Sequence, residues 1–162
     1  MGREIERKFL VTGDGWRKGA KRSRLSQGYL YAGKDKSVRV RLEDGQGTVT
    51  IKGPTLGASR AEYEYSIPAK DARELLSRLC ERPLIEKTRS RVRRGGLVWE
   101  IDEFGGDNKG LVLAEIELRR PNQKVALPPW VGKEVTCDPR YLNSNLFKKS
   151  YKRWASRRGS KK

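Results

Sequence analysis

Apolar and polar residues alternate with a period of two along most of this chain, as expected of strands whose two faces meet different surroundings. Segments with this pattern cover residues 3–11, 25–32, 37–43, 48–52, 60–67, 84–93, 97–104 and 111–119. Turn signals follow several of them: Asp44-Gly45 and Gly95-Gly96 predict tight turns, and a turn that begins at Gly33 follows residue 32. The pattern therefore predicts about eight strands joined mostly by short turns.

Two segments depart from this alternation. Residues 69–81 have helical spacing with Ala72, Leu75 and Leu76 on one stripe, and Pro83 ends the helix. Residues 140–154 predict a second, amphipathic helix, whereas the Pro-rich segment 121–133 is irregular. Strands joined by short turns favour a mainly β (α+β) fold, in which an antiparallel meander closes into a β-barrel with a few peripheral helices.

The charged faces of these strands are sorted by sign. One such strand alone is explained by an ordinary solvent-facing surface. Six strands, however, carry two like charges at positions i and i+2: Glu4/Glu6, Arg39/Arg41, Glu62/Glu64, Lys87/Arg89, Glu100/Asp102 and Glu115/Glu117. Exposed faces usually mix the two signs, because like charges on one strand face repel. The repetition favours a barrel whose charged faces line a lumen and whose apolar outer faces are covered by helices and loops.

Length and charge set further limits. The chain has 162 residues, enough for one domain with a core. We expect the domain to cover residues 1–154 and a basic, disordered tail to follow at 155–162. The 37 basic and 20 acidic residues give a net charge of +17, and residues 148–162 hold eight basic residues and no acidic one. This balance favours anionic partners, namely phosphates, nucleic acid or acidic membrane surfaces.

Other residue types narrow the chemistry. The absence of histidine excludes Ser-His and Cys-His nucleophile pairs and His-ligated zinc. Cys80 and Cys137 are far apart and are expected to be free thiols of a reducing compartment. No apolar stretch is long enough for a signal peptide or a membrane span, so the expected location is the cytoplasm.

Acidic and basic doublets around one lumen have complementary chemistry. Carboxylate oxygens hold hard divalent cations, and Arg side chains form forked contacts with phosphate oxygens. A basic wall would bind a triphosphate, while Mg²⁺ or Mn²⁺ would neutralise the charge that develops on the leaving oxygens. A second ion, or a carboxylate or phenolate base, would activate the attacking water. These residue types favour metal-dependent triphosphate hydrolysis.

The first strand contains Glu4-Ile5-Glu6-Arg7-Lys8, which resembles the ExExK signature of the CYTH superfamily, the triphosphate tunnel metalloenzymes. The resemblance runs from about residue 2 to residue 147, and it is closest to short bacterial members that hydrolyse inorganic tripolyphosphate. The further segments that carry it are Gln27-Gly28-Tyr29-Leu30, Arg39-x-Arg41, Thr50-Ile51-Lys52, Glu62-Tyr63-Glu64, Glu86-Lys87-Thr88-Arg89, Glu100-Ile101-Asp102, Ala114-Glu115-Ile116-Glu117 and residues 130–136.

This resemblance implies an eight-stranded antiparallel tunnel with two kinds of binding residue. The residues expected to bind the substrate phosphates are Lys8, Arg39, Arg41, Lys52, Lys87 and Arg89. The metal-binding residues would be Glu4, Glu6, Glu62, Glu64, Asp102, Glu115 and Glu117. The cofactor would be Mg²⁺ or Mn²⁺, with two ions when substrate is bound.

The resemblance also assigns proton handling to Tyr29 and Lys87. A nearby ammonium group favours phenolate and lowers the pKa of a tyrosine, so this assignment is chemically sound. The alternative for Tyr29 is an aromatic side chain that only packs in the barrel. The last helix resembles a plug that closes one end of the tunnel, and the residues after Trp154 have no counterpart in the family.

The sequence leaves the substrate and partners open in several respects. Nucleoside, thiamine and RNA triphosphatases and class IV-type adenylate cyclases share the tunnel, and four tryptophans could stack on an organic group, although at least two are expected to pack on the barrel exterior. A non-catalytic module that binds polyphosphate or nucleic acid is the alternative from another class. Its weakness is the acidic doublets, which would repel a bare polyanion. The tail is expected to be a solubilising segment, with contact to nucleic acid or a membrane as the alternative, and nucleic acid would be contacted through the tail only. The oligomeric state, a homodimer included, is not determined.

Overall fold

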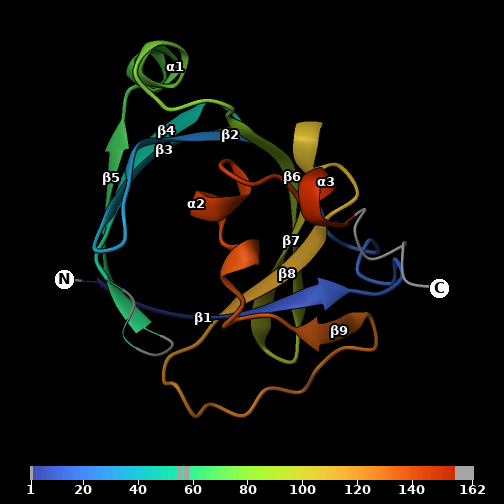
Figure 1. Ribbon diagram of the computed structural model, residues 1–162. Coiled ribbons are helices and arrows are strands. Elements are labelled where there is room, and N and C mark those ends of the chain that lie inside the picture. Colours follow the sequence, from blue (N-terminus) through green and yellow to red (C-terminus); the bar gives the residue numbers. More distant parts are fainter. Residues whose placement is uncertain (1, 55, 57–58, 156–162) are drawn as a thin grey trace.

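A computed structural model describes residues 2–54, 56 and 59–155 of the chain. Antiparallel strands form a closed ring in it (Figure 1). They are β1 (Gly2–Val11), β2 (Lys21–Ala32), β3 (Ser37–Glu43), β4 (Gln46–Lys52), β5 (Ser59–Ile67), β6 (Ile85–Arg94), β7 (Leu97–Phe104) and β8 (Val112–Glu117). Their order is β5-β4-β3-β2-β6-β7-β8-β1, and β1 closes the ring by pairing with β5. The predicted closed β-barrel is confirmed.

The predicted tight turns are present. Asp44 and Gly45 have φ angles of 45° and 84°, and Gly95 and Gly96 have φ angles of 59° and 75°. Two successive positive φ angles give a hairpin turn whose twist matches that of the flanking strands. The strand β2 begins earlier than predicted, since residues 21–24 pair with β6 from Lys21 onward. All four residues are polar, so they show no apolar alternation.

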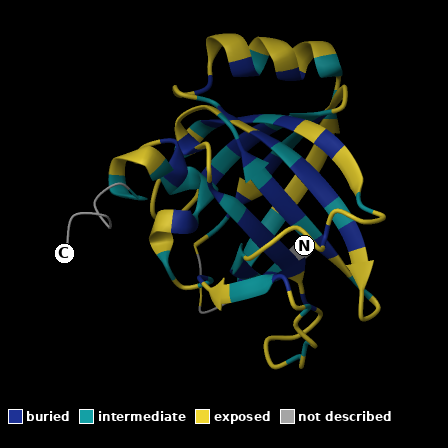
Figure 2. Ribbon diagram, turned by 90° about the vertical axis from the view of Figure 1, so that its right-hand side faces the viewer, coloured by how far each residue is buried: buried dark blue, intermediate teal, exposed yellow. Residues whose placement is uncertain are grey.

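The helix α1 (Ala69–Arg78) covers the outer face of β3 and β4. It packs there on Val40 through Ala72 and Leu76. The chain that follows α1 runs close to β2, where a Cβ atom on Gly28 would lie 2.8 Å from the Cβ atom of Cys80. Figure 2 shows the outer side of α1 exposed and buried positions along the strands beneath it.

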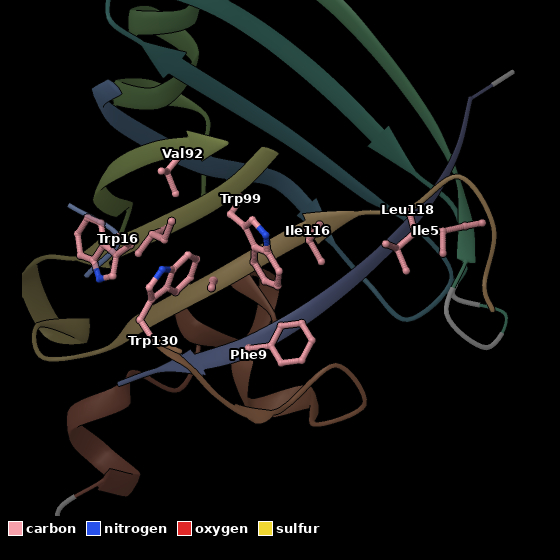
Figure 3. Close-up of a cluster of buried hydrophobic side chains, with 10 residues drawn as sticks. Ile5, Phe9, Trp16, Val92, Trp99, Ile116, Leu118 and Trp130 are labelled. Atoms are coloured by element: carbon pink, nitrogen blue, oxygen red, sulfur yellow. The ribbon is translucent and has the colours of Figure 1, made fainter. Parts of the chain in front are cut away.

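A second apolar cluster lies on the opposite outer face of the barrel (Figure 3). Phe9 and Trp99 point outward from their strands, and Trp16 and Trp130 from two loops cover them. The Trp99 and Trp130 rings meet edge to face, with centroids 5.4 Å apart. The predicted covering of an apolar exterior is confirmed, as is the expectation that at least two tryptophans pack there.

The C-terminal segment fills part of the barrel. A single helix was predicted over 140–154, and this is wrong: the segment forms η2 (Pro139–Tyr141), α2 (Asn143–Leu146) and α3 (Tyr151–Ala155). Side chains bind the backbone groups that a continuous helix would use. Asn145 donates from its amide to the Pro139 carbonyl oxygen at 2.8 Å, and the Tyr151 amide donates to the Asn108 side-chain oxygen at 2.7 Å.

In Figure 1, α2 lies inside the ring of strands. Leu146 and Phe147 pack there on inward-facing side chains, including Tyr29, Phe104 and Leu113. The expected C-terminal plug is therefore present, and we use this name for residues 139–147. One end of the lumen is apolar and occupied, so polar ligands can reach only the remaining part.

Two short elements complete the described structure, one between β7 and β8 and one between β8 and the plug. The 3-10 helix η1 (Gly106–Asn108) follows β7. The strand β9 (Val131–Glu134) pairs with β1. Its segment was predicted to be irregular, because four residues are too few to show a period.

In the described part of the chain, none of the helices combines the length and apolar character needed to cross a membrane. Residues 156–162, most of the predicted tail, lie outside the described residues.

Candidate active site

The barrel lumen contains a cavity of about 520 Å³. Its lining comes from alternating positions on one face of each strand, together with residues 142–144 of the plug. The predicted site residues that line it are Glu4, Glu6, Lys8, Tyr29, Arg39, Arg41, Lys52, Glu62, Glu64, Arg89, Glu115 and Glu117. The like-charged doublets therefore face a common lumen.

The strand order divides this cavity into two halves. The strands with acidic doublets, β7, β8, β1 and β5, are consecutive around the barrel, since β1 lies between β8 and β5. The basic doublets lie on β3 and β6 and Lys52 lies on β4; these strands complete the ring together with β2. Lys8 on β1 and Arg60 on β5 are cations on the acidic strands. One half of the wall is thus mainly acidic and the other mainly basic.

Opposite charges form ion pairs where the two halves meet and also within the acidic half. The Lys52 ammonium lies 2.7 Å from Glu4 Oε2 and 2.8 Å from Glu62 Oε2. The Lys8 ammonium lies 2.9 Å from Glu115 Oε1. Burial alone would raise the pKa of Glu115, but Lys8 and Arg89 hold that pKa well below its usual range. Glu115 is therefore a carboxylate at neutral pH.

Lys87 and Asp102 share the inward strand faces of Arg89 and Glu100 but do not line the cavity. Their side chains are fully buried, and the Lys87 ammonium donates to Asp102 Oδ2 at 2.6 Å. Arg89 donates to both oxygens of the same carboxylate at 2.7 Å. Burial lowers the pKa of Lys87 to about 8 although Asp102 opposes this, and the neighbouring Arg89 adds to the lowering.

This position bears on two predicted roles. Both oxygens of Asp102 already accept hydrogen bonds from cations, and Lys87 has no exposed surface toward the cavity. Asp102 as a metal ligand and Lys87 as a phosphate ligand stay predictions. What the geometry gives directly is a buried carboxylate that fixes the Arg89 guanidinium in the wall.

The basic half has donors without acceptors. The Nε atoms of Arg39 and Arg41 are buried and have no hydrogen-bond partner among the described residues. Burial and the charges of Arg39 and Arg89 lower the pKa of Arg41 to about 10. Buried guanidinium groups normally have partners, so this wall is suited to an anion with several acceptor oxygens.

The acidic half has the opposite imbalance. Glu117 on β8 lies directly across from Glu6 on β1, and like charges in this position repel. Burial raises the pKa of Glu117, and the carboxylates of Glu4 and Glu62 raise it further, followed by those of Glu100 and Glu6. Among the described residues, Glu117 has no ion-pair partner, so this wall is suited to a cation.

Tyr29 lines the cavity and also packs against the plug. Its ring stacks on that of Phe147, with centroids 5.1 Å apart and an interplanar angle of 19°. Burial raises the pKa of the phenol and outweighs the opposing effect of Arg39 and Arg60. The Lys8 ammonium also lowers this pKa, as expected of a nearby ammonium, but its effect is smaller than that of burial.

Four charged lining residues were not among the predicted site residues: Glu43, Arg60, Arg91 and Glu100. Arg60 Nε donates to Glu4 Oε2 at 3.0 Å, and Arg91 forms ion pairs with Glu43 and Glu100. Each of the four stands two residues from a predicted site residue on the same strand face. Extending the doublets by one step would have found Glu43, Arg60 and Arg91, and Glu100 already belongs to the Glu100/Asp102 doublet.

Comparison with known proteins agrees with this geometry. The family model for the CYTH domain matches residues 2–151. The chain belongs to the CYTH family. An inorganic triphosphatase of Acetivibrio thermocellus is 54% identical over 152 residues, covering 94% of this chain and 97% of the relative. An inorganic triphosphatase of Nitrosomonas europaea is 40% identical over 151 residues, covering 88% of this chain and 95% of the relative.

Solved structures show the same CYTH architecture. The inorganic triphosphatase NE1496 superposes with a TM-score of 0.65 at 35% identity, covering 91% of this chain and 95% of that one. The PH1012 protein from Pyrococcus horikoshii superposes with a TM-score of 0.56 at 22% identity, covering 73% of this chain and 80% of that one. The second likeness concerns the fold alone.

The acidic half fits the divalent ion on which CYTH triphosphatases depend. Its donors are all carboxylate oxygens, the ligands that Mg²⁺ and Mn²⁺ prefer. Among the described residues, no three carboxylates are grouped closely enough to hold an ion by themselves. Mg²⁺ is commonly bound by one or two carboxylates together with substrate phosphates. Glu6 and Glu117, directly opposite each other, suit an ion that is bound together with a triphosphate.

Proposed function

We propose that this CYTH chain hydrolyses inorganic tripolyphosphate to pyrophosphate and phosphate, with Mg²⁺ or Mn²⁺ in the barrel lumen. The observation that carries this is the opposite unmet charge of the two cavity halves. The pKa of Arg41 is lowered to about 10 by burial and neighbouring cations, and that of Glu117 is raised by burial and neighbouring carboxylates. A polyanion bound with a divalent cation would neutralise both walls, whereas a bare polyanion would neutralise only one.

The aromatic residues support an inorganic substrate. Trp16, Trp99 and Trp130 pack on the barrel exterior. Among the described residues, Tyr29 is the aromatic side chain that lines the cavity, and its ring stacks on Phe147. An adenine or thiamine ring would therefore find little stacking surface. The names of the two curated relatives, both inorganic triphosphatases, support the same choice.

The chain's residues divide into two working sets under this proposal. The phosphates would be held by Lys8, Arg39, Arg41, Lys52 and Arg89, with Asp102 and Lys87 behind Arg89. The metal side would consist of Glu4, Glu6, Glu62, Glu64, Glu115 and Glu117. Two bound ions would stabilise charge on the leaving phosphate and lower the pKa of the attacking water. Tyr29, a protonated phenol at neutral pH, would donate a hydrogen bond to a phosphate oxygen.

The test is phosphate release from tripolyphosphate by the purified chain. We expect release with Mg²⁺ or Mn²⁺ and none after chelation with EDTA. Glu4→Gln should lower kcat/KM roughly a hundredfold or more, because it weakens the acidic wall and frees Lys52. ATP and thiamine triphosphate in the same assay should be poorer substrates.

Glu74→Gln is the matched control, because Glu74 is exposed on α1 outside the barrel. It should keep full activity. Thermal denaturation of the Glu4→Gln protein separates loss of the site from loss of the fold. Activity that persists in EDTA, or in both Glu4→Gln and Glu117→Gln, would contradict the two-walled mechanism. Binding of tripolyphosphate without turnover in any metal would favour the non-catalytic binding module.

A further inference from the structure

A second cavity, of about 310 Å³, adjoins the main one at the plug. It lies between the β2–β3 connection, Gly53 and the plug side of the barrel. The residues that line both cavities are Ser37, Arg60, Leu142 and Ser144. The side cavity therefore borders the lumen in which the triphosphate is proposed to bind.

The charge of the side cavity differs from that of the lumen. Its ionisable lining residues are Lys34, Lys36, Arg60 and Lys148, and none of its lining residues is acidic. The lumen, in contrast, has carboxylates on half of its wall. A lining with four cations and no carboxylate provides no anionic ligand for a metal ion, so it suits an anion that binds without one.

Two of these residues are fixed by contacts. The Lys148 ammonium donates to the Ala32 carbonyl oxygen at 2.6 Å, which links the segment after the plug to the end of β2. Arg60 Nε donates to Glu4 at 3.0 Å, so its guanidinium stands at the boundary of the two cavities. Positive charge thus continues from the basic side of the lumen through Arg60 to the side cavity.

On the basis of the proposed function, we infer that the side cavity is a phosphate subsite for linear polyphosphates longer than tripolyphosphate. Such a chain repeats the same charged unit, so a fourth phosphate beyond the three in the lumen would meet Lys34, Lys36 and Lys148. Charge-assisted hydrogen bonds to phosphate oxygens would then hold it. Tripolyphosphate itself would not need this subsite.

The test compares tripolyphosphate and tetrapolyphosphate as substrates. The double variant Lys34→Ala/Lys36→Ala removes two exposed lining cations that, among the described residues, form no ion pair with the plug or the lumen. We expect kcat/KM for tetrapolyphosphate to fall about tenfold, the effect of losing one charge-assisted hydrogen bond. The value for tripolyphosphate should change by less than about twofold.

The matched control is Lys70→Ala/Lys109→Ala, which removes the same charge at exposed positions away from both cavities. It should leave both substrates unchanged. An equal loss for both substrates, or no loss for either, would overturn the subsite. Weaker inhibition by free phosphate without any change in chain-length preference would overturn it as well, and would identify the product as the occupant.

A binding measurement separates this inference from the proposed function. Calorimetry with tetrapolyphosphate in EDTA requires no turnover, and the Lys34→Ala/Lys36→Ala protein should bind about tenfold more weakly than the wild type. If the wild type does not hydrolyse tripolyphosphate but still binds tetrapolyphosphate more tightly than the variant, the proposed function is wrong and the subsite is supported. Hydrolysis by the wild type without this difference would count against the subsite alone.

Discussion

At the scale of single residues, Glu117 is a carboxyl group whose ionised form is destabilised by its surroundings in the site. Burial and four neighbouring carboxylates raise the pKa of its carboxyl group. A raised carboxyl pKa means that the ionised form destabilises the fold as pH rises through that value. At neutral pH the metal-free protein therefore carries a cost that a bound cation would remove.

We expect Glu117→Gln to raise the free energy of unfolding of the metal-free protein at pH 7 and to abolish tripolyphosphate hydrolysis. The gain should disappear in acid, below the ordinary glutamate pKa of about 4.3, where both proteins are neutral at this position. Urea denaturation in EDTA at both pH values measures it. Glu74→Gln is the control, and lower stability of Glu117→Gln at pH 7 would contradict the argument.

Lys87 gives a second prediction, on pH. Its pKa in the folded protein is lowered to about 8 by burial, against an ordinary value near 10.5. Between these two values the unfolded chain holds more protons, so this group makes the protein more stable as pH rises. Relative to Lys87→Met, the wild type should therefore gain stability between pH 8 and about 10. If urea denaturation gives the same difference in free energy of unfolding between the two proteins across this pH range, the pKa of Lys87 is not lowered.

At the scale of elements, the strands were predictable where apolar and polar residues alternate, and unpredictable elsewhere. The limits of β3 and β7 are those predicted, because both faces of these strands have unlike surroundings. The strand β9 is four residues long, and the plug depends on side chains such as Asn108 and Asn145 that reach it from a distance or replace backbone bonds. No local pattern contains that information.

The plug provides an element-scale prediction. Phe147 is buried and stacks on Tyr29 at the closed end of the lumen. Phe147→Ala should lower the free energy of unfolding by about 3–5 kcal/mol, as large-to-small changes in a core do, and raise KM by freeing Tyr29. Chemical denaturation and steady-state kinetics measure the two effects. Leu127→Ala, at an exposed position, should cost no more than about 0.5 kcal/mol, and an equally small cost for Phe147→Ala would show that the plug is not part of the core.

At the scale of the whole molecule, charge is distributed between a lumen with both signs and a strongly basic C-terminal end. Among the described residues, those that line the lumen lie between positions 4 and 144, well before residue 155. Deleting residues 156–162 should leave kcat/KM for tripolyphosphate within about twofold at physiological salt, where charges beyond about 8 Å are screened. A large loss of activity would show that the domain boundary is wrong. The full-length chain in the same buffer is the reference.

The sequence by itself determined the class of fold and most of the charged lining, because alternation fixes which side chains share a strand face. It also indicated, through the sorted doublets and the CYTH resemblance, what kind of ligand the lumen would take. Only the tertiary structure decided which strands are neighbours, and so that the acidic strands form one continuous wall. It also decided that Asp102 and Lys87 are fully buried outside the cavity lining and that Tyr29 packs on the plug. The position of a side chain along the barrel axis depends on strand register and on packing against distant segments. A local sequence pattern encodes neither of these.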